Sequence, residues 1–221
     1  MIAQNGSSSD QGEGIVGLLL RLRAHGIQDA QFLKAIESVP RDRFVPPEFH
    51  NLAWADTHLP IACGQTMPSP DMLVRMVDAL NLDPGHAVLE IGTGSGYLTA
   101  LLARLSRKVT SIDRYASLLD QARRKLTALK YSNIALEQRD GSASAPGGSL
   151  FDRIIVDSAY ESMPRAMLDH LAAEGVMVTA IGPVGGEQML VRLTKIGSRF
   201  EREDLFPVRF TGLVGSVARA L

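Results

Sequence analysis

From Gly85 onward, apolar runs of strand length alternate with longer amphipathic segments, and this alternation constrains the fold more than any other feature. We expect strands over residues 87–91, 109–112, 134–137, 151–156 and 176–181. We expect helices over residues 97–105, 117–129 and 164–173. This order is typical of β–α–β units, which build a parallel sheet. The sequence therefore predicts an α/β fold.

The two ends of the chain lack this alternation. Near the C-terminus, apolar runs over 189–196 and 200–210 flank a Gly-Ser pair and predict an antiparallel hairpin at an edge of the sheet. At the N-terminus, the Gly- and Ser-rich residues 1–13 predict a flexible tail, and helices are expected over 14–25 and 29–39.

Between these helices and the sheet, residues 40–70 are dense in proline and glycine. This density favours extended or turn-rich backbone over long helices. Pro70 at the end of the segment suits the first turn of a further helix.

Composition limits the class of protein. The chain has 221 residues, 45% of them hydrophobic and 21% charged, which is ordinary for a globular protein. Its 23 basic and 24 acidic side chains argue against a nucleic-acid binder, which would carry a basic stripe. One cysteine, Cys63, excludes an internal disulfide and a Cys-rich zinc site, and the five histidines lack metal-ligand spacing, so no metal is expected.

Nothing in the sequence directs the chain to a membrane. The longest early apolar stretch is far shorter than the roughly 20 residues that a spanning helix needs. The first ten residues lack the basic and apolar regions of a secretory signal. Because a lone thiol also suits a reducing compartment, we expect a cytoplasmic protein without a membrane partner.

A glycine cluster, Gly92-Thr93-Gly94-Ser95-Gly96, joins the first expected strand to the helix that begins at Tyr97. Alternating glycines allow a ligand to lie against the main chain, although an ordinary Gly-rich turn would look the same. A dinucleotide fingerprint has its third glycine where this chain has Tyr97. The pattern therefore favours a ligand without phosphates.

Acidic residues follow the next two expected strands. Asp113 comes about 20 residues after the glycines, where a carboxylate can accept hydrogen bonds from both hydroxyls of a ribose. Asp140-Gly141 follows the third strand, where a carboxylate can accept from an exocyclic amine such as that of adenine. Taken singly, Asp113 is compatible with a solvated strand end and Asp140-Gly141 with a common turn. Together with the glycines they predict a nucleoside pocket.

These three elements resemble the S-adenosylmethionine pocket of Rossmann-like methyltransferases. The surrounding sequence is similar to one branch of them, the protein-L-isoaspartate O-methyltransferases. The similar stretches are Arg41-Asp42-Arg43-Phe44-Val45-Pro46, Leu59-Pro60-Ile61, Gly64-Gln65-Thr66, residues 89–97 and Pro207-Val208-Arg209-Phe210.

The resemblance implies a three-layer sandwich with a mostly parallel seven-stranded sheet, an N-terminal helical cap and a C-terminal antiparallel hairpin. It implies one domain over residues 14–221, with the cap and substrate loop in 14–84, the cofactor-binding core in 85–182 and the hairpin in 183–221. It also implies S-adenosylmethionine as cofactor, S-adenosylhomocysteine as its product, and esterification of L-isoaspartyl carboxylates in damaged proteins or peptides, which is a repair reaction. We expect a monomer.

Residue by residue, the resemblance assigns Gly92, Thr93 and Gly94 to the methionine and ribose side of the cofactor. It assigns Asp113 to the ribose hydroxyls and Asp140 to the adenine. The candidate cofactor-binding residues are Glu90, Gly92, Thr93, Gly94, Gly96, Asp113, Arg114, Asp140, Gly141 and Asp157. The candidate catalytic residues are Gln65, Thr66 and Ser69.

Several positions depart from the family pattern. The family has Gly-Gln-Thr-Ile-Ser over the methyl-transfer site, whereas this chain has Pro68 in place of the serine and Ser69 one position later. We expect Ser69 or a loop amide to orient the acceptor instead. In addition, Asp157-Ser158-Ala159-Tyr160 replaces a usual Thr-Ala-Ala run, and Arg139 stands where a glycine is common.

The chemistry leaves the acceptor open. A carboxylate has a reference pKa of about 4, so transfer to it needs positioning and no strong base. An amine or phenol acceptor would need a base, for which Asp157 and His58 are candidates. The alternatives are a methyltransferase of the same fold acting on a small molecule or specific peptide, a cofactor-binding module without isoaspartyl activity, and a nicotinamide oxidoreductase, against which Tyr97 counts.

Overall fold

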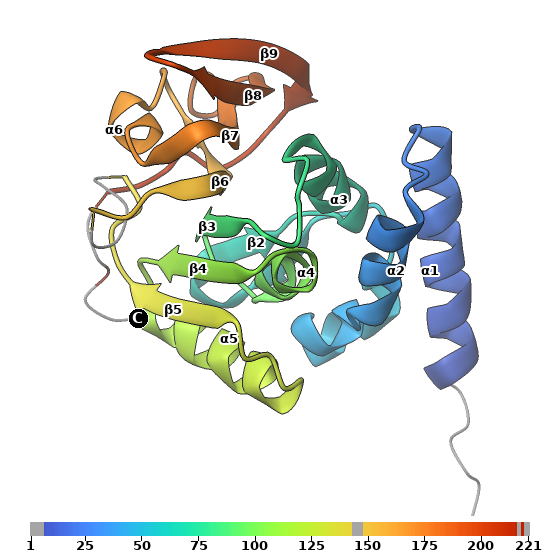
Figure 1. The fold of residues 1–221 in the computed structure, drawn as a ribbon. Helices are drawn as coiled ribbons and strands as arrows, with labels where there is room; N and C mark the ends of the chain where they lie inside the picture. The colour runs from blue at the N-terminus through green and yellow to red at the C-terminus, as the bar shows by residue number, and fades with distance from the viewer. Residues whose placement is uncertain (1–6, 143–147, 216–217, 219–221) are drawn as a thin grey trace, which may run out of the picture.

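The computed structural model describes residues 7–142, 148–215 and 218, and its centre is a seven-stranded sheet (Figure 1). The strand order is β5-β4-β3-β6-β7-β8-β9. The bounds are β3 Ala87–Ile91, β4 Lys108–Asp113, β5 Ile134–Gln138, β6 Phe151–Tyr160, β7 Leu171–Ile181, β8 Gln188–Ile196 and β9 Arg199–Val208. Strands β3 to β7 are parallel, and β8 and β9 form an antiparallel hairpin beside β7. The predicted α/β sheet with its C-terminal hairpin is confirmed.

Alternate residues of the central strands pack into two cores, one on each face of the sheet. Val88 and Ile155 belong to the larger core, whereas Leu89 and Ile154 belong to the smaller one. The larger core is covered by α3 (Pro70–Ala79), α4 (Tyr97–Leu105) and α5 (Ala116–Ala128), and the smaller one by α6 (Arg165–Leu168). A strand buried on both faces requires this period of two.

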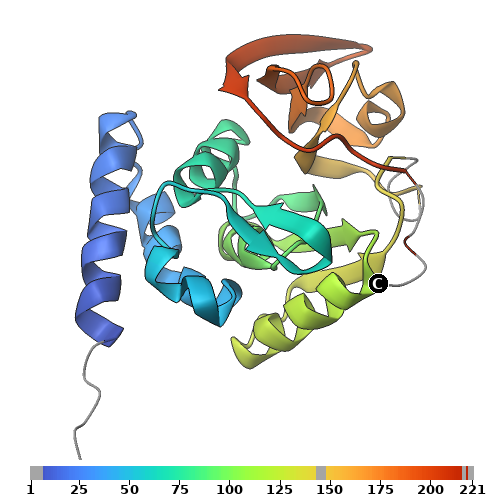
Figure 2. The same cartoon turned by 180° about the vertical axis from the view of Figure 1, so that it is seen from behind.

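The N-terminal helices α1 (Ser7–Ala24) and α2 (Ala30–Ser38) lie together at one side of the molecule, outside α3 and α4 (Figures 1 and 2). The Asp29 carboxylate caps α2 by accepting a hydrogen bond from the Phe32 N–H at 2.6 Å. The helix α1 begins at Ser7, within the segment predicted as a tail, and residues 1–6 lie outside the described part of the chain. The predicted helical cap is confirmed.

Residues 40–70 form short elements, as their proline content predicts. Two 3-10 helices, η1 (Arg41–Phe44) and η2 (Pro47–Leu52), precede a small antiparallel hairpin of β1 (Leu59–Ile61) and β2 (Gln65–Met67). The turn of this hairpin, η3 (Ala62–Gly64), contacts α5. The tip of the hairpin is therefore folded back against α5.

One expected helix is shorter than predicted and ends in a strand. The prediction over 164–173 was wrong beyond Leu168, because β7 begins at Leu171 and pairs with the start of β6. The Phe151 N–H donates to the His170 carbonyl oxygen at 2.9 Å and extends this pairing. Strand pairing here overrides the helical spacing of the apolar residues.

After β9 the chain returns to the sheet. Ala159 of β6 donates to the Thr211 carbonyl oxygen at 2.9 Å and accepts from the Leu213 N–H at 2.8 Å. This bridge lies beyond Val156, where the pairing of β3 with β6 ends. The C-terminal segment therefore passes over the carboxyl ends of the central strands. None of the helices in the described residues is long and apolar enough to span a bilayer.

Candidate active site

A cavity of about 240 Å³ opens at the carboxyl ends of β3 and β4. We call it the cofactor cavity. Its predicted lining residues are Gln65, Thr66, Gly92, Gly94, Asp113, Arg114, Gly141 and Asp157. Its other lining residues, which the sequence did not single out, are Ile61, Ile91, Ile112, Tyr115, Leu118, Arg139, Ser158 and residues 211–214.

The glycine loop needs its glycines for two different reasons. Gly92 and Gly94 have φ angles of +96° and +51°, and both line the cavity. A Cβ at Gly92 would lie 3.4 Å from the Cβ of Asp157 and would fill space beside the ligand site. Gly96, with φ +88°, is the N-cap of α4, and a Cβ there would lie 3.0 Å from the Cβ of Ala122. Gly96 is thus a structural residue outside the cavity lining.

Asp113 ties the end of β4 to the glycine loop. Its carboxylate accepts the N–H groups of Tyr115 at 2.9 Å and Gly94 at 3.0 Å. Burial raises the pKa of Asp113, and these backbone N–H groups oppose the rise. A carboxylate has about four lone-pair positions, so Asp113 can still accept from a ligand hydroxyl.

Glu90 near the end of β3 and Thr93 in the glycine loop were predicted to bind the cofactor, but the structure does not bring their side chains to the cavity. The Thr93 hydroxyl is 2.6 Å from the Ser111 hydroxyl of β4. The Glu90 carboxylate accepts from the Thr99 hydroxyl of α4 at 2.6 Å and is fully buried. Burial raises the pKa of Glu90 to about 8. Through these hydrogen bonds Thr93 holds the glycine loop to β4, and Glu90 holds β3 to α4.

Gly141 lines the cavity, but Asp140 is not among the lining residues. A Cβ at Gly141 would lie only 2.3 Å from Cγ2 of Ile91, so glycine is required there. The Asp140 carboxylate accepts from the Ser142 N–H at 2.8 Å and from its hydroxyl at 2.6 Å. These contacts are typical of an Asx turn. Of the residues next to Gly141 on this turn, Arg139 is the one whose polar side chain belongs to the cavity lining.

A second cavity of about 270 Å³ adjoins the first, and we call it the acceptor cavity. Its lining residues are His58, Thr66, Pro68, Asp157, Gly185, Gly186, Arg209, Phe210 and Thr211. Thr66, Asp157 and Thr211 line both cavities and so mark the junction between them. Sequence reasoning missed Arg209 as a site residue, although it belongs to one of the stretches that carry the family resemblance.

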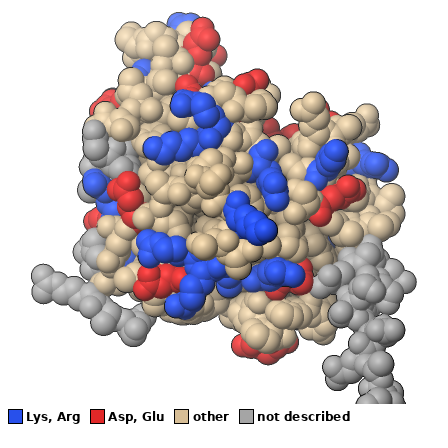
Figure 3. Space-filling model, turned by 60° about the horizontal axis from the view of Figure 1, so that its bottom comes forward, with Lys and Arg blue, Asp and Glu red and all other residues tan. Residues whose placement is uncertain are grey.

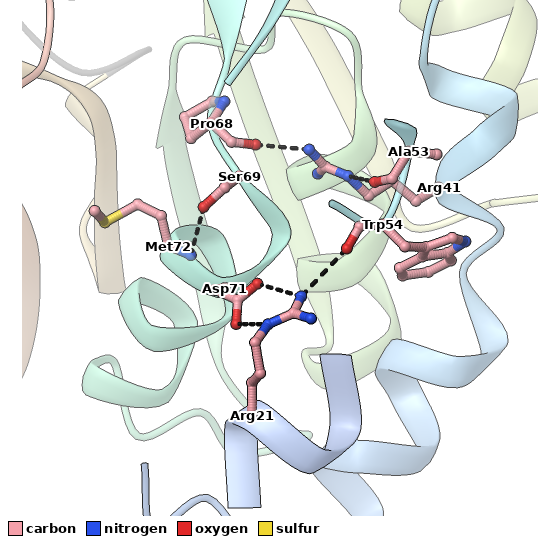
Figure 4. A network of polar contacts seen from close by, with 8 residues as sticks. All are labelled: Arg21, Arg41, Ala53, Trp54, Pro68, Ser69, Asp71 and Met72. Carbon is pink, nitrogen blue, oxygen red and sulfur yellow. Dashed lines mark hydrogen bonds and ion pairs between the residues drawn. The ribbon is translucent and has the colours of Figure 1, made fainter. Parts of the chain in front are cut away.

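A polar network fixes the loop beside the acceptor cavity (Figure 4). The fully buried Arg41 donates from Nε to the Ala53 carbonyl oxygen and from Nη2 to the Pro68 carbonyl oxygen, both at 2.7 Å. Arg21 of α1 pairs with Asp71 of α3 through two hydrogen bonds of 2.8 Å. Arg41 therefore joins distant parts of the loop to one another, and Arg21 joins α1 to α3.

Ser69 has a different place from the one predicted. It is the N-cap of α3, where its hydroxyl accepts the Met72 N–H at 3.2 Å (Figure 4). Ser69 is only 3% exposed and lines neither cavity. The structure thus brings Gln65 and Thr66 to the site but not Ser69. The pair Ser69-Pro70 is the signal for this role, because serine favours the N-cap and proline the first helical position.

Asp157 lies at the junction of the cavities and is half-buried. Burial and the nearby Asp113 carboxylate raise the pKa of Asp157 to about 7, against the opposing charge of Arg41.

Among the described residues, no group of three or more His, Cys, Asp and Glu side chains is placed to hold a metal ion.

Comparison with known proteins decides the family. The model of the protein-L-isoaspartate(D-aspartate) O-methyltransferase family matches residues 16–218. The chain belongs to this family. A relative from Rhodopseudomonas palustris (strain HaA2), named protein-L-isoaspartate O-methyltransferase 2, is 46% identical over 202 residues, which cover 91% of this chain and 93% of the relative. A protein-L-isoaspartate O-methyltransferase of Rhizobium meliloti (strain 1021) is 40% identical and covers 92% of this chain and 100% of its own length.

Solved structures agree on the fold. A Plasmodium falciparum protein described as a protein-L-isoaspartate O-methyltransferase, crystallised with S-adenosyl-L-homocysteine, superposes with a TM-score of 0.76 at 24% identity. That match covers 90% of this chain and 97% of the other. A second protein-L-isoaspartate O-methyltransferase gives a TM-score of 0.79 at 22% identity and covers 92% of this chain and 67% of its own. These likenesses establish the methyltransferase fold.

Proposed function

We propose that this chain is an S-adenosylmethionine-dependent methyltransferase that esterifies the free carboxylate of L-isoaspartyl residues in damaged proteins and peptides. The observation that carries the proposal is that two cavities meet at Thr66, Asp157 and Thr211. The cofactor cavity suits a nucleoside, and the acceptor cavity beside it leaves room for a methyl acceptor. The family to which the chain belongs has this activity in its description.

The residues of the cofactor cavity fit S-adenosylmethionine. The walls Ile91, Ile112 and Leu118 suit an adenine ring, and Asp113 suits the ribose hydroxyls. Gly92 and Gly94 leave the main chain open beside Asp157. When bound, this cofactor supplies the electrophilic methyl carbon and becomes S-adenosylhomocysteine.

The protein itself then has to position the acceptor carboxylate against the methyl group. An acceptor carboxylate is ionised at neutral pH and needs no base, and good alignment of two reactants contributes on the order of 7–11 kcal/mol. We assign the orienting hydroxyl to Thr66, which lines both cavities, and hydrogen-bonding support to Gln65, whose amide donates to the Cys63 carbonyl oxygen at 3.0 Å. Ser69 is too buried for this role.

The test is transfer of a radiolabelled methyl group to an isoaspartyl peptide and to the peptide of the same sequence with normal aspartate. We expect base-labile methyl ester on the isoaspartyl peptide alone. Equal labelling of both peptides, or of neither, would overturn the proposal.

A second candidate is a methyltransferase for a small molecule or a specific peptide. Pro68 favours it, because proline offers the acceptor cavity no N–H and its carbonyl oxygen is already bonded to Arg41. Labelled product in a small-molecule extract, without labelled isoaspartyl peptide, would decide for this candidate. A cofactor-binding module without turnover would label neither.

We further propose a cytoplasmic monomer whose partners are its damaged acceptors, without nucleic acid or membrane. The lone cysteine suits a reducing compartment. Figure 3 shows Lys and Arg side chains gathered on one face, with acidic side chains beside several of them. One exposed pair is Arg123 with Asp120 on α5, at 2.9 Å. Interspersed charges of this kind are typical of a solvated surface.

A further inference from the structure

Asp157 occupies an irregular part of β6. The pairing of β3 with β6 ends at Val156, and the register of β6 against β7 shifts between Ile155 and Ala159. Asp157 is therefore the first residue of β6 beyond its pairing with β3. Register shifts next to active sites commonly redirect a side chain, and Asp157 lines both cavities.

Few buried side chains in the lining of the acceptor cavity can donate a hydrogen bond. Pro68 has no N–H, and Ser69 is the buried cap of α3. The side-chain donors in the lining, His58, Thr66, Arg209 and Thr211, belong to exposed residues. Among the described residues, no hydrogen-bond donor contacts the Asp157 carboxyl, which leaves it available to a bound acceptor.

We propose that Asp157, as a neutral carboxylic acid, donates a hydrogen bond to the carboxylate of the methyl acceptor and thereby makes this site specific for carboxylates. The proposal rests on the proposed function. One acceptor oxygen accepts the hydrogen bond, and the other forms the new bond to the methyl carbon as the bond from methyl to sulfur breaks. The proton stays on Asp157 throughout.

The surrounding charges decide whether Asp157 holds its proton. Asp113 on β4 and burial raise the pKa of Asp157, and Arg41 on η1 lowers it, with the balance at about 7. The charge of Asp157 also acts on Glu90 of β3. His58 and Arg209 line the acceptor cavity with Asp157, and Arg114 and Arg139 line the cofactor cavity with it. An arriving acceptor carboxylate favours the neutral form further, because two carboxyl groups in one site share a proton.

The first test is the pH dependence of kcat/KM for an isoaspartyl peptide in the wild type and in Asp157→Asn. The wild-type value should fall about tenfold for each pH unit above about pH 7, because the ionised carboxylate cannot donate. Asp157→Asn should give a flat profile over the same range, since its amide donates at every pH. Asp157→Ala should also be flat, but about tenfold below Asp157→Asn, for the loss of one hydrogen bond.

Two variants serve as controls. Asp169→Asn changes an exposed aspartate that lines neither cavity, and it should keep the wild-type profile. His58→Gln removes the imidazole that lines the acceptor cavity, and it should keep the alkaline fall. An alkaline fall that disappears in His58→Gln and persists in Asp157→Asn would overturn the proposal.

A second readout needs neither cofactor nor turnover. With ¹³C-labelled aspartate, NMR of the protein alone should show one carboxyl signal that titrates near pH 7 and is missing in Asp157→Asn. A signal assigned to Asp157 that titrates wholly at the reference value of about 4 would overturn the inference. An active wild type with a flat pH profile would overturn this inference alone, whereas no methyl transfer at any pH would overturn the proposed function and this inference with it.

Discussion

Arg41 of η1 donates a hydrogen bond to the carbonyl oxygen of Pro68 at 2.7 Å, and so connects the start of the acceptor loop to the lining of the acceptor cavity. The same guanidinium lies 4.7 Å from the centre of the Tyr97 ring, at the start of α4. Burial lowers the pKa of Arg41 to about 10, so it remains charged at neutral pH. One side chain thus sets the position of the acceptor loop relative to the glycine loop.

Replacing this side chain should loosen the acceptor loop. Arg41→Met leaves the carbonyl oxygens of Ala53 and Pro68 buried without their donor, and each unpaired buried group costs about 1–3 kcal/mol. We expect a lower free energy of unfolding in urea and a higher KM for the peptide. Arg43→Met, at an exposed neighbour on η1, is the matched control and should change neither quantity. Equal stability of the two variants would contradict the structural role of Arg41.

Asp113 should control cofactor affinity. Asp113→Ala removes the acceptor for ribose hydroxyls and the contact with the Gly94 N–H. Hydrogen bonds to a charged group are worth about 1.5–3 kcal/mol, so S-adenosylhomocysteine should bind on the order of tenfold to a hundredfold more weakly by calorimetry. Asp120→Ala on α5 should bind as the wild type does. An unchanged Kd in Asp113→Ala would place the ribose elsewhere.

Ser69 should matter for stability and not for turnover. Ser69→Ala removes the N-cap of α3 and should lower the free energy of unfolding by about 1 kcal/mol, with kcat/KM within about twofold of the wild type. Pro68→Ser places a hydroxyl in the acceptor-cavity lining and should keep or raise activity. A loss of turnover in Ser69→Ala without loss of stability would instead support the orienting role that the sequence suggested.

Glu90 should make the protein less stable as the pH rises. Its pKa is about 8 in the folded state, and an unfolded glutamate has a pKa of about 4.3. Between these values the folded state holds the proton and the unfolded state does not, so the free energy of unfolding falls as pH increases. The fall should be on the order of 1 kcal/mol per pH unit in that window. Glu90→Gln should flatten the urea-unfolding profile between about pH 5 and about pH 8, and an unchanged slope would contradict the burial of a neutral Glu90.

Local sequence patterns predicted most of the sheet and several of the polar and glycine residues that line the cofactor cavity. The strand 87–91, its glycine loop and Asp113 lie within one continuous stretch, where strand length, backbone freedom and side-chain chemistry agree. The segment 171–173 was wrongly predicted as helix because its conformation depends on pairing with β6, which apolar spacing along the chain does not report.

The acceptor cavity was harder to predict, because distant segments assemble it. Arg209 lies close to the bridge between Ala159 and Gly212, which brings the C-terminal segment to the site, and such long-range contacts leave no periodic signal. Ser69 was assigned to catalysis although its sequence neighbour Pro70 already marked a helix start. Glu90 and Thr93 carry the right motif, but their side chains face the core and not the ligand.

The most direct measurement of the central claim locates the transferred methyl group. A peptide with one isoaspartyl residue and several ordinary carboxyl groups is incubated with the protein and S-adenosylmethionine, and tandem mass spectrometry then identifies the modified residue. The junction of the two cavities at Thr66 and Asp157 predicts a single methyl ester, on the isoaspartyl carboxyl alone. Methyl esters spread over the ordinary carboxyl groups, or an unmodified peptide, would contradict it.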